Sequence, residues 1–549
     1  MNTGRFKPSS IALATLLAAS AVHAAPKPFM WENATVYFVV TDRFSNGDKS
    51  NDFPYGRKAD AAPLRGFMGG DLKGLTARVK EGYFDSLGVN AIWLTPPVEQ
   101  IHAGTDEGTG KSYGFHGYWA RDFTAIDANL GTEADFRAFV EAAHARGIRV
   151  LFDVVMNHIG PVTGQDPNWP ADWVRMDPVC THKDVATTVT CALVANLPDV
   201  RTESNENVAL PPALVEKWKK EGRYEREVKE LDEFFSRTGY PRAPRYYLMK
   251  WHADWVRKYG IDGFRADTVK HTEPGVWKEL RTVADAAFED YRKAHPGKAL
   301  GDKFFTVAEV YNYSIGHGRE FDMSTAKVDF YADGFDALIN FSLPSDGKGD
   351  YESIFAKYAA ALHGPLRGKS VLNYMDSHDD GNPFDAARTK PFETANKLLL
   401  APGAAQIYYG DETARRLDMA EATGDAKLRS YMNWEELAHN TARDGYRIAD
   451  VRAHWSKLGL FRQNHLSIGA GEHRKLADKP YTFARIFGND KVVVALDVPV
   501  GKPVAVSVGS VFANGTRVRD AYSGVTYTVR NGKVATGGKA GVVLLEAAR

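Results

Sequence analysis

The apolar stretch from Ile261 to Ala266 ends abruptly in ionisable residues. A helix-favouring segment, 246–259, precedes it and stops at Gly260, which is the pattern of a crossover helix followed by a buried parallel strand. Because side chains alternate along a strand, Arg265 and Asp267 share one face. We expect the guanidinium to keep Asp267 ionised, although a purely structural ion pair would show the same spacing.

Seven further apolar stretches have the character of strands, and helical segments lie between most of them. They cover residues 34–41, 88–95, 148–155, 304–308, 334–341, 370–375 and 405–409. Eight strands with parallel connections favour a (β/α)8 TIM barrel, an α/β fold, over a doubly wound sheet. Functional residues are then expected at the carboxyl ends of the strands.

Three regions depart from this rhythm. Residues 159–205 are rich in Pro, Asp and Thr, carry both cysteines, and predict an inserted domain after the third strand. A charged helical insertion follows at about 206–245, with a surface helix pair over 213–237. Beyond about residue 450, period-two runs such as 491–498 and a hairpin signal at 527–534 predict antiparallel β-structure. The predicted division is a barrel over 25–158 and 206–450, an inserted domain over 159–205 and a C-terminal β-domain over 451–549.

Charge does not direct this chain toward nucleic acid or an anionic membrane. The 549 residues include 69 Lys and Arg and 69 Asp and Glu, so the formal net charge is zero and the favoured partner is uncharged. A hydrophobic content of 44% is that of an ordinary globular protein, and we expect it to be a monomer.

The first 24 residues have the features of a signal peptide. Arg5 and Lys7 precede an apolar run over 11–22, and Ala24 ends a small-residue cleavage site. No later stretch reaches the roughly 20 apolar residues that a membrane span needs. We therefore expect an exported protein, either periplasmic or secreted. In such an oxidising compartment Cys180 and Cys191 are expected to pair, the alternative being two buried thiols.

An oxygen-rich loop follows the first strand. Asn46, Asp48, Asn51 and Asp52, with Asp71 from a later turn, would suit a hard cation such as calcium. The spacing is not that of an EF-hand, so a solvated Asx-rich turn remains open as an alternative.

Three carboxyl groups stand at the ends of the fourth, fifth and seventh predicted strands: Asp267, Glu309 and Asp379. A retaining glycosidase needs two carboxyl groups roughly 5 Å apart, one a nucleophile and the other an acid that later acts as a base. Asp267 beside Arg265 suits the nucleophile. Glu309 suits the acid because its apolar neighbours would raise its pKa, and Asp379 would hold sugar hydroxyls.

At this point the sequence resembles the α-amylase family of glycoside hydrolases, family 13. Its four main motifs are matched in order by residues 153–158, residues 263–271, the Glu309 strand and residues 377–379, and Leu197-Pro198-Asp199-Val200 resembles the fifth. The charged insertion and the export signal most resemble periplasmic bacterial α-amylases.

The resemblance implies roles for individual residues. Asp267 would be the nucleophile, Glu309 the proton donor and Asp379 the transition-state stabiliser. Substrate contacts would come from His116, Tyr118, Trp119, His158, Arg265, Lys270, His271 and His378. One calcium would be held by Asn157, Asp199 and the main chain of His271. The loop of Asn46, Asp48, Asn51 and Asp52, with Gly69 and Asp71, resembles a second calcium site of cyclodextrin glucanotransferases.

The expected activity is endo-acting hydrolysis of internal α-1,4-glucosidic bonds in maltodextrins and soluble starch, through a covalent glycosyl-Asp267 intermediate. An α-glucan transglycosylase using the same site is the alternative, and a non-catalytic glycan-binding protein is a remote one. A divalent-metal lyase of the enolase type would also place acids at barrel strand ends. Arg265 beside Asp267 opposes a divalent cation there.

Overall fold

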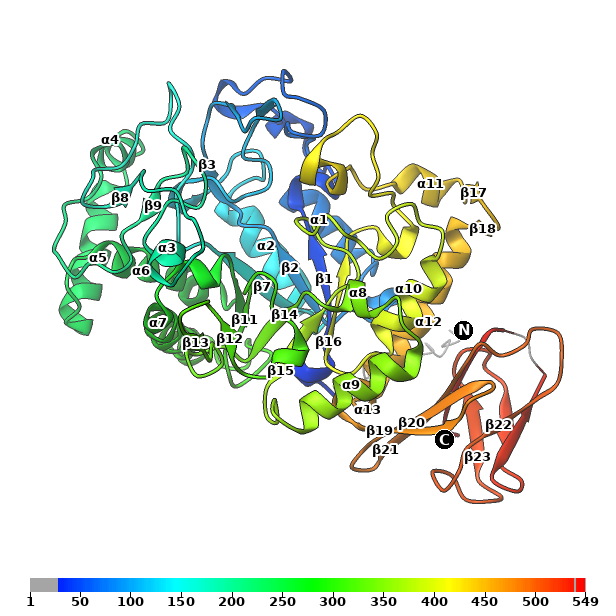
Figure 1. The fold of residues 1–549 in the computed structure, drawn as a ribbon. Coiled ribbons are helices and arrows are strands. Elements are labelled where there is room, and N and C mark those ends of the chain that lie inside the picture. Colours follow the sequence, from blue (N-terminus) through cyan, green and yellow to red (C-terminus); the bar gives the residue numbers. More distant parts are fainter. Residues whose placement is uncertain (1–27, 538–539, 549) are drawn as a thin grey trace, which may run out of the picture.

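The computed structural model describes residues 28–537 and 540–548, and its centre is a closed barrel of eight parallel strands (Figure 1). Around the barrel the order is β1-β16-β15-β14-β11-β10-β7-β2, and the ring is closed because β1 pairs with β2, as Val36 with Ala91, as well as with β16. The strands are β1 Thr35–Val39, β2 Ala91–Leu94, β7 Arg149–Val154, β10 Gly263–Ala266, β11 Phe305–Ala308, β14 Ala337–Asn340, β15 Ser370–Asn373 and β16 Ala404–Tyr408. Each of the eight predicted strands is present, and the (β/α)8 prediction is confirmed.

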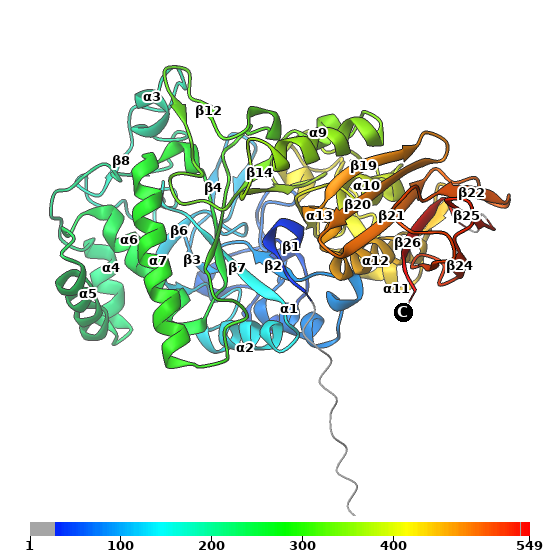
Figure 2. The same cartoon turned by 90° about the horizontal axis from the view of Figure 1, so that it is seen from below.

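Helices cover the outside of the barrel and pack through apolar faces. In α2 (Glu133–His144), Thr132 and Asp135 form a capping box, and the buried side chains recur at helical spacing from Phe136 to Ala143 as the sequence predicted. The others are α1 Leu72–Lys80, α6 Pro244–Tyr259, α7 Pro274–Ala294, α8 Leu343–Asp346, α9 Tyr351–His363, α10 Pro391–Leu399 and α12 Ile448–Asn464. The layers are seen from a second side in Figure 2.

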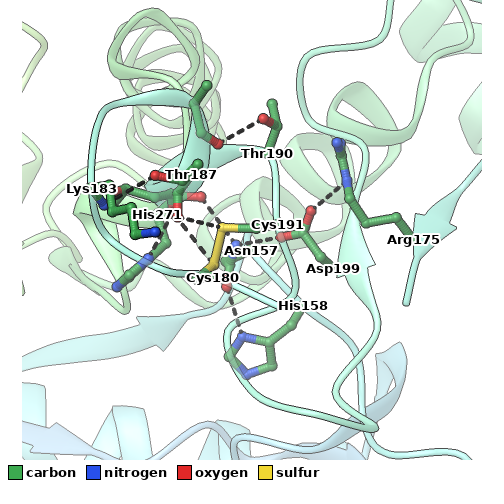
Figure 3. Close-up of a disulfide and its surroundings, with 12 residues drawn as sticks. Asn157, His158, Arg175, Cys180, Lys183, Thr187, Thr190, Cys191, Asp199 and His271 are labelled. Carbon is green, nitrogen blue, oxygen red and sulfur yellow. Dashed lines mark hydrogen bonds and ion pairs between the residues drawn. A yellow bond between two sulfur atoms is a disulfide. The ribbon is translucent and has the colours of Figure 1, made fainter. Parts of the chain in front are cut away.

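The region inserted after β7 is an irregular excursion over the carboxyl ends of the strands. It contains β8 (Val174–Arg175), the short helix α3 (Ala186–Val189) and β9 (Asp199–Val200), and β8 pairs with β9 in antiparallel fashion. Cys180 and Cys191 are joined by a disulfide, with their Cα atoms 5.0 Å apart, so the predicted pairing is confirmed (Figure 3).

A pair of charged helices follows, α4 (Pro212–Lys220) and α5 (Tyr224–Thr238), as the sequence predicted. Their apolar side chains, including Trp218 and Leu231, are buried. Lys217 Nζ lies 2.8 Å from the fully buried carboxylate of Asp122 in β6 (Ala120–Ile126), which ties the helix pair to the two-stranded sheet of β3 and β6. Small ribbons in the loops are β3 Val98–Gln100, β4 Thr105–Asp106, β5 Lys111–Ser112, β12 Phe321–Asp322, β13 Lys327–Val328, β17 Ala442–Arg443 and β18 Tyr446–Arg447, with α11 Trp434–Ala438 before the last two.

The C-terminal region consists of a six-stranded antiparallel sheet and a two-stranded ribbon, and lies at one side of the barrel (Figures 1 and 2). The sheet order is β19-β20-β21-β26-β23-β24, and the ribbon is β22-β25. The strands are β19 Glu472–Ala477, β20 Tyr481–Phe487, β21 Asp490–Leu496, β22 Val504–Ser507, β23 Arg517–Asp520, β24 Thr526–Thr528, β25 Lys533–Thr536 and β26 Val542–Ala547. Position 451, the predicted domain boundary, lies inside α12, which packs against α10.

Of the hairpin predicted over 527–534, the turn is confirmed, but the longer pairing of its two arms is not found. The chain does turn at Asn531-Gly532, where Arg530 and Lys533 form an isolated bridge. The flanking strands, however, pair with other partners, β24 with β23 and β25 with β22. The turn signal was real, but it connects two different sheets.

Two contacts close the amino-terminal end of the barrel. The Trp31 ring stacks on Phe305 with centroids 3.9 Å apart. The fully buried Arg462 of α12 donates hydrogen bonds to the carbonyls of Asn33, Leu399 and Ala401 at 3.0–3.2 Å. The predicted signal peptide, residues 1–24, lies outside the described residues. Within the described part, no helix is long and apolar enough to span a membrane.

Candidate active site

The three predicted carboxyl residues line one cavity of about 660 Å³ at the carboxyl ends of the barrel strands. Asp267 follows β10, Glu309 follows β11 and Asp379 lies in the loop after β15. Six of the predicted substrate contacts line the same cavity: His116, Tyr118, Trp119, His158, Lys270 and His271. The other two, Arg265 and His378, are 1% exposed and lie behind the cavity wall, in contact with the carboxylates.

Arg265 binds both candidate catalytic groups with one guanidinium. Its Nη1 donates to Asp267 Oδ1 at 2.6 Å, and its Nη2 lies 3.1 Å from Glu309 Oε2. Nη1 also donates to Asp153 Oδ1 at 3.0 Å, and the buried Asp153 accepts further hydrogen bonds from Trp93 Nε1 and Tyr118 Oη. The barrel interior therefore fixes the guanidinium, which in turn fixes the two carboxyl groups.

Thr268, directly after Asp267, adopts a left-handed conformation with φ 48° and ψ 38°. Such a conformation is costly for a β-branched residue and is often found at functional sites. It turns the amide of Thr268 toward Glu309, whose Oε2 accepts a 2.9 Å hydrogen bond. The turn of the chain after β10 therefore helps to fix the carboxyl group of Glu309, which follows β11.

The three carboxyl groups lie in different electrostatic environments. Burial raises the pKa of Glu309 to about 7, with Arg265 opposing the shift and the charge of Asp267 adding to it. Burial also raises the pKa of Asp267, and Arg265, which was expected to keep this group ionised, counteracts only part of the effect. Burial of Asp379 is outweighed by His378 and Arg429, which hold its pKa well below the usual range.

Asp379 is held by two cationic or polar partners. His378 Nε2 lies 2.8 Å from Asp379 Oδ2, and Arg429 pairs with Oδ1. Arg429 also donates from Nε to the carbonyl of His378 at 3.1 Å and lies 2.6 Å from Asp425. The arrangement keeps an ionised carboxylate facing the cavity.

Aromatic and apolar side chains form the rest of the wall. Tyr118 stacks on His378 with centroids 5.4 Å apart, and His158 contacts the Tyr118 carbonyl through Nε2 at 3.0 Å. The inserted region also contributes Val194, which is 55% exposed, and the segment after β11 contributes Tyr311, which is 42% exposed. Apolar faces with a few fixed polar groups are typical of sugar-binding clefts.

Comparison with known proteins agrees with this geometry. The family model described as the alpha amylase catalytic domain matches residues 38–455. The chain belongs to the alpha-amylase family. It is 39% identical to the periplasmic alpha-amylase of Escherichia coli over 534 residues, a match that covers 85% of this chain and 72% of that protein.

Two further relatives show how widely this alpha-amylase fold is used. The chain is 27% identical to the cyclomaltodextrin glucanotransferase of Geobacillus stearothermophilus over 483 residues, covering 84% of this chain and 59% of that enzyme. The solved structure of an Anoxybacillus alpha-amylase superposes with a TM-score of 0.67 at 21% identity, covering 95% of this chain and all of the other. The chain is a glycoside hydrolase of the alpha-amylase type, and the proteins similar to it include both an alpha-amylase and a cyclomaltodextrin glucanotransferase.

The residues that were expected to hold a first calcium ion do converge, between the barrel and the inserted region (Figure 3). Asn157 Nδ2 donates to Asp199 Oδ1 at 2.8 Å and to the carbonyl of His271 at 3.1 Å. The second oxygen of Asp199, however, lies 2.7 Å from Arg175 Nε. A guanidinium at this distance does not fit a divalent cation on the same carboxylate.

The second expected site fits a cation better, although two of its residues have other partners. Buried amide oxygens of Asn46 and Asn51 have no hydrogen-bond partner, and Asn46 Nδ2 lies 2.8 Å from Asp52 Oδ1. Gly69 has φ +87° and approaches so closely that an added Cβ would lie 2.7 Å from Asp52 Oδ1. Asp48 instead pairs with Lys73, and Asp71 accepts hydrogen bonds from the backbone amides of Gly47, Asp48 and Gly74.

Sequence reasoning missed three contributors to this alpha-amylase site. Asp153 is the first residue of the family motif 153–158. Its position near the end of an apolar strand could have identified it as a residue of the site. The conformation of Thr268 has no sequence signal, because left-handed threonine is rare. Arg429 comes from the 3-10 turn after β16, 50 residues from Asp379, and nothing in the sequence links the two.

Proposed function

We propose that this alpha-amylase hydrolyses internal α-1,4-glucosidic bonds of maltodextrins and soluble starch with retention of configuration. The observation that carries the proposal is the attachment of Asp267 and Glu309 to the two terminal nitrogens of one guanidinium, in the cavity that Asp379 also lines. Two carboxyl groups with distinct environments are what a double displacement requires.

In the first step a carboxylate oxygen of Asp267 forms a bond to the anomeric carbon as the glycosidic bond breaks. Glu309, whose raised pKa keeps a proton near neutral pH, gives that proton to the departing oxygen. In the second step a water attacks the glycosyl-Asp267 ester and Glu309 takes the water's proton. Asp379, ionised beside Arg429, stabilises positive charge on the sugar ring in both steps.

The second candidate is transglycosylation, which differs only in the acceptor. The exposed apolar side chains of Val194 and Tyr311 favour it, because they give a second sugar a surface on which to displace water. Product analysis on maltoheptaose decides between them, with proton NMR at early times. Hydrolysis predicts shorter α-anomeric products and one reducing end per cleavage, whereas products longer than the substrate, or cyclic ones, would favour transfer. Initial β-anomers would contradict both.

The same proposal includes one calcium ion, at the loop after β1. Asn46, Asn51 and Asp52, with the main chain of Gly69, would hold it through oxygen atoms. A bound cation would neutralise Asp52 and order the loop. Asp42, in the same segment, accepts hydrogen bonds from the amides of Met68 and Gly69, so the loop already has a fixed backbone frame.

Export and a monomeric state complete the proposal. The apolar run over 11–22 and the similarity to a periplasmic alpha-amylase support export. Sedimentation of the purified protein tests the monomer, and amino-terminal sequencing of protein from a periplasmic fraction tests cleavage after Ala24. A mature protein that begins at Met1 would contradict the export proposal.

A further inference from the structure

The junction between the barrel and the inserted region is where calcium was expected and where its residues do not fit. We propose that Arg175 takes the place of that calcium, so that a fixed guanidinium, and not a dissociable metal ion, holds the inserted region on the barrel. The proposal concerns the junction only and does not depend on the reaction proposed above.

The position of Arg175 is set by the backbone. Arg175 and Asp199 are direct partners in the β8–β9 ribbon, so their side chains lie on the same face. Arg175 Nε lies 2.7 Å from Asp199 Oδ2, and the two side chains are 10% and 2% exposed. Figure 3 shows the guanidinium directed at the Asp199 carboxylate.

Two further oxygens at the junction already have a donor, whereas the buried Glu273 Oε1 has none. Asn157 Nδ2 occupies Asp199 Oδ1 and the His271 carbonyl together. Calcium takes six to eight oxygen ligands, and here the one carboxylate has a cation on one oxygen and an amide on the other. A divalent ion on Asp199 Oδ1 would require the Asn157 amide to rotate and present its oxygen, and the ion would face the guanidinium across the carboxylate as a like charge.

Other charges around Arg175 support its role as the local cation. Its Nη2 also pairs with Glu203 Oε2 at 2.5 Å. Glu273 lies nearby, accepts a hydrogen bond from Thr202 Oγ1 at 2.6 Å, and adds negative charge at the junction. Arg175 therefore supplies positive charge to these acids and offsets part of the effect of burial, which raises the pKa of Asp199 to about 8.

The junction supports the cavity wall. His158, which lines the cavity, forms an isolated bridge with Asp199, and the carbonyl of Thr188 accepts from His271 Nδ1 at 2.9 Å. Because an arginine side chain does not dissociate, this wall keeps its position when metal ions are removed. Chelation is then expected to act on the Asn46 loop and not on the junction.

The experiment counts calcium ions bound after equilibrium dialysis, in the wild type, in Asp199→Asn and in Asn51→Ala. The expected result is that Asp199→Asn binds as much calcium as the wild type, while Asn51→Ala loses one equivalent if the loop site exists. Loss of one equivalent in Asp199→Asn would overturn the proposal. A wild type that binds no calcium would contradict the loop site only, since the count in Asp199→Asn would still be unchanged.

Two variants of Arg175 test the role of the charge itself. In chelator, Arg175→Met, which keeps the length of the side chain, is expected to lower the Tm by about 5 °C or more, because it leaves Asp199 buried without a cation. Arg175→Lys retains the charge and is expected to recover at least half of that loss. Equal Tm values for the wild type and Arg175→Met in chelator would show that the guanidinium does not hold the junction.

Discussion

The backbone amide of Thr268 donates a 2.9 Å hydrogen bond to Glu309 Oε2. Thr268 directly follows the proposed nucleophile, so the position of the proposed acid depends on the backbone that carries Asp267. An amide oxygen in place of the carboxylate oxygen would still accept this hydrogen bond. A glutamine at position 309 would therefore lose the transferable proton and keep the hydrogen bond from the Thr268 amide.

We predict that Glu309→Gln lowers kcat about 10²- to 10⁴-fold on maltoheptaose and leaves the fold intact, because only the transferable proton is lost. Steady-state kinetics and thermal unfolding measure the two effects. Glu320→Gln is the control, since Glu320 is exposed and pairs only with Lys327 in a surface contact. A kcat within threefold of the wild type would remove Glu309 from the mechanism.

The rate should depend on the protonation of Glu309. Because its pKa is about 7 and the protonated form is the active one, kcat/KM should fall as the pH rises through about 7. Initial rates from pH 5 to 9, in buffers of constant ionic strength, give the profile. In Glu309→Gln the remaining activity should not show this alkaline limb, and an identical limb in the variant would assign the titration to another group.

A histidine connects the C-terminal sheet to the end of α12. His465 lies 2.7 Å from Asp490 and 2.8 Å from Glu546, and these hydrogen bonds to carboxylates raise its pKa to about 9 although burial alone would lower it. The folded state therefore holds this proton more tightly than the unfolded state, whose pKa is near 6.5. The stabilisation is complete below about pH 6.5 and is lost as the pH rises through about 9.

His465→Gln should accordingly lower the free energy of unfolding by about 1–3 kcal/mol at pH 6 and by much less at pH 10. Urea denaturation at the two pH values measures the difference. His439→Gln, at an exposed position, serves as the control. An equal loss at both pH values would mean that the protonated ring is not the source of the stability.

The disulfide should stabilise the inserted region. Cys180 and Cys191 are 11 residues apart, and in the loop-closure model a crosslink of this length contributes about 3 kcal/mol. The double variant Cys180→Ala/Cys191→Ala should therefore have a lower Tm. Because Thr188, inside the loop, accepts from His271, KM should rise more than kcat falls. Unchanged Tm and KM would contradict both parts.

The fold was largely predictable because its signals are local. Each barrel strand is a short apolar run. The change from apolar to ionisable residues where the run ends, as from Ala266 to Asp267, identifies the carboxyl end of the strand. Helix α12 was not anticipated in full, because its buried face includes the polar residues His454 and Arg462 and its exposed face includes Ala453, so hydrophobicity does not recur clearly at helical spacing.

The site was predictable to the extent that its residues follow strands. Asp267 and Glu309 do so directly, and their proximity follows from the parallel register of β10 and β11. Arg175 illustrates the limit. Its partnership with Asp199 depends on the pairing of two-residue strands 24 residues apart in an irregular region, and such pairing has no periodic signal.

The barrel closes between its first and last strands, with Thr35 beside Ala405 and Arg462 tying both ends together. During synthesis some 370 further residues must therefore be added before β16, the strand that pairs with one edge of β1, exists. At typical ribosomal rates this takes on the order of 20–70 s. For that time the chain carries an unpaired apolar edge, which invites pairing with other chains. The yield of folded protein on expression should therefore depend on the rate of synthesis and on chaperones that cover unpaired strand edges. It should depend less on substitutions that change the stability of the completed barrel.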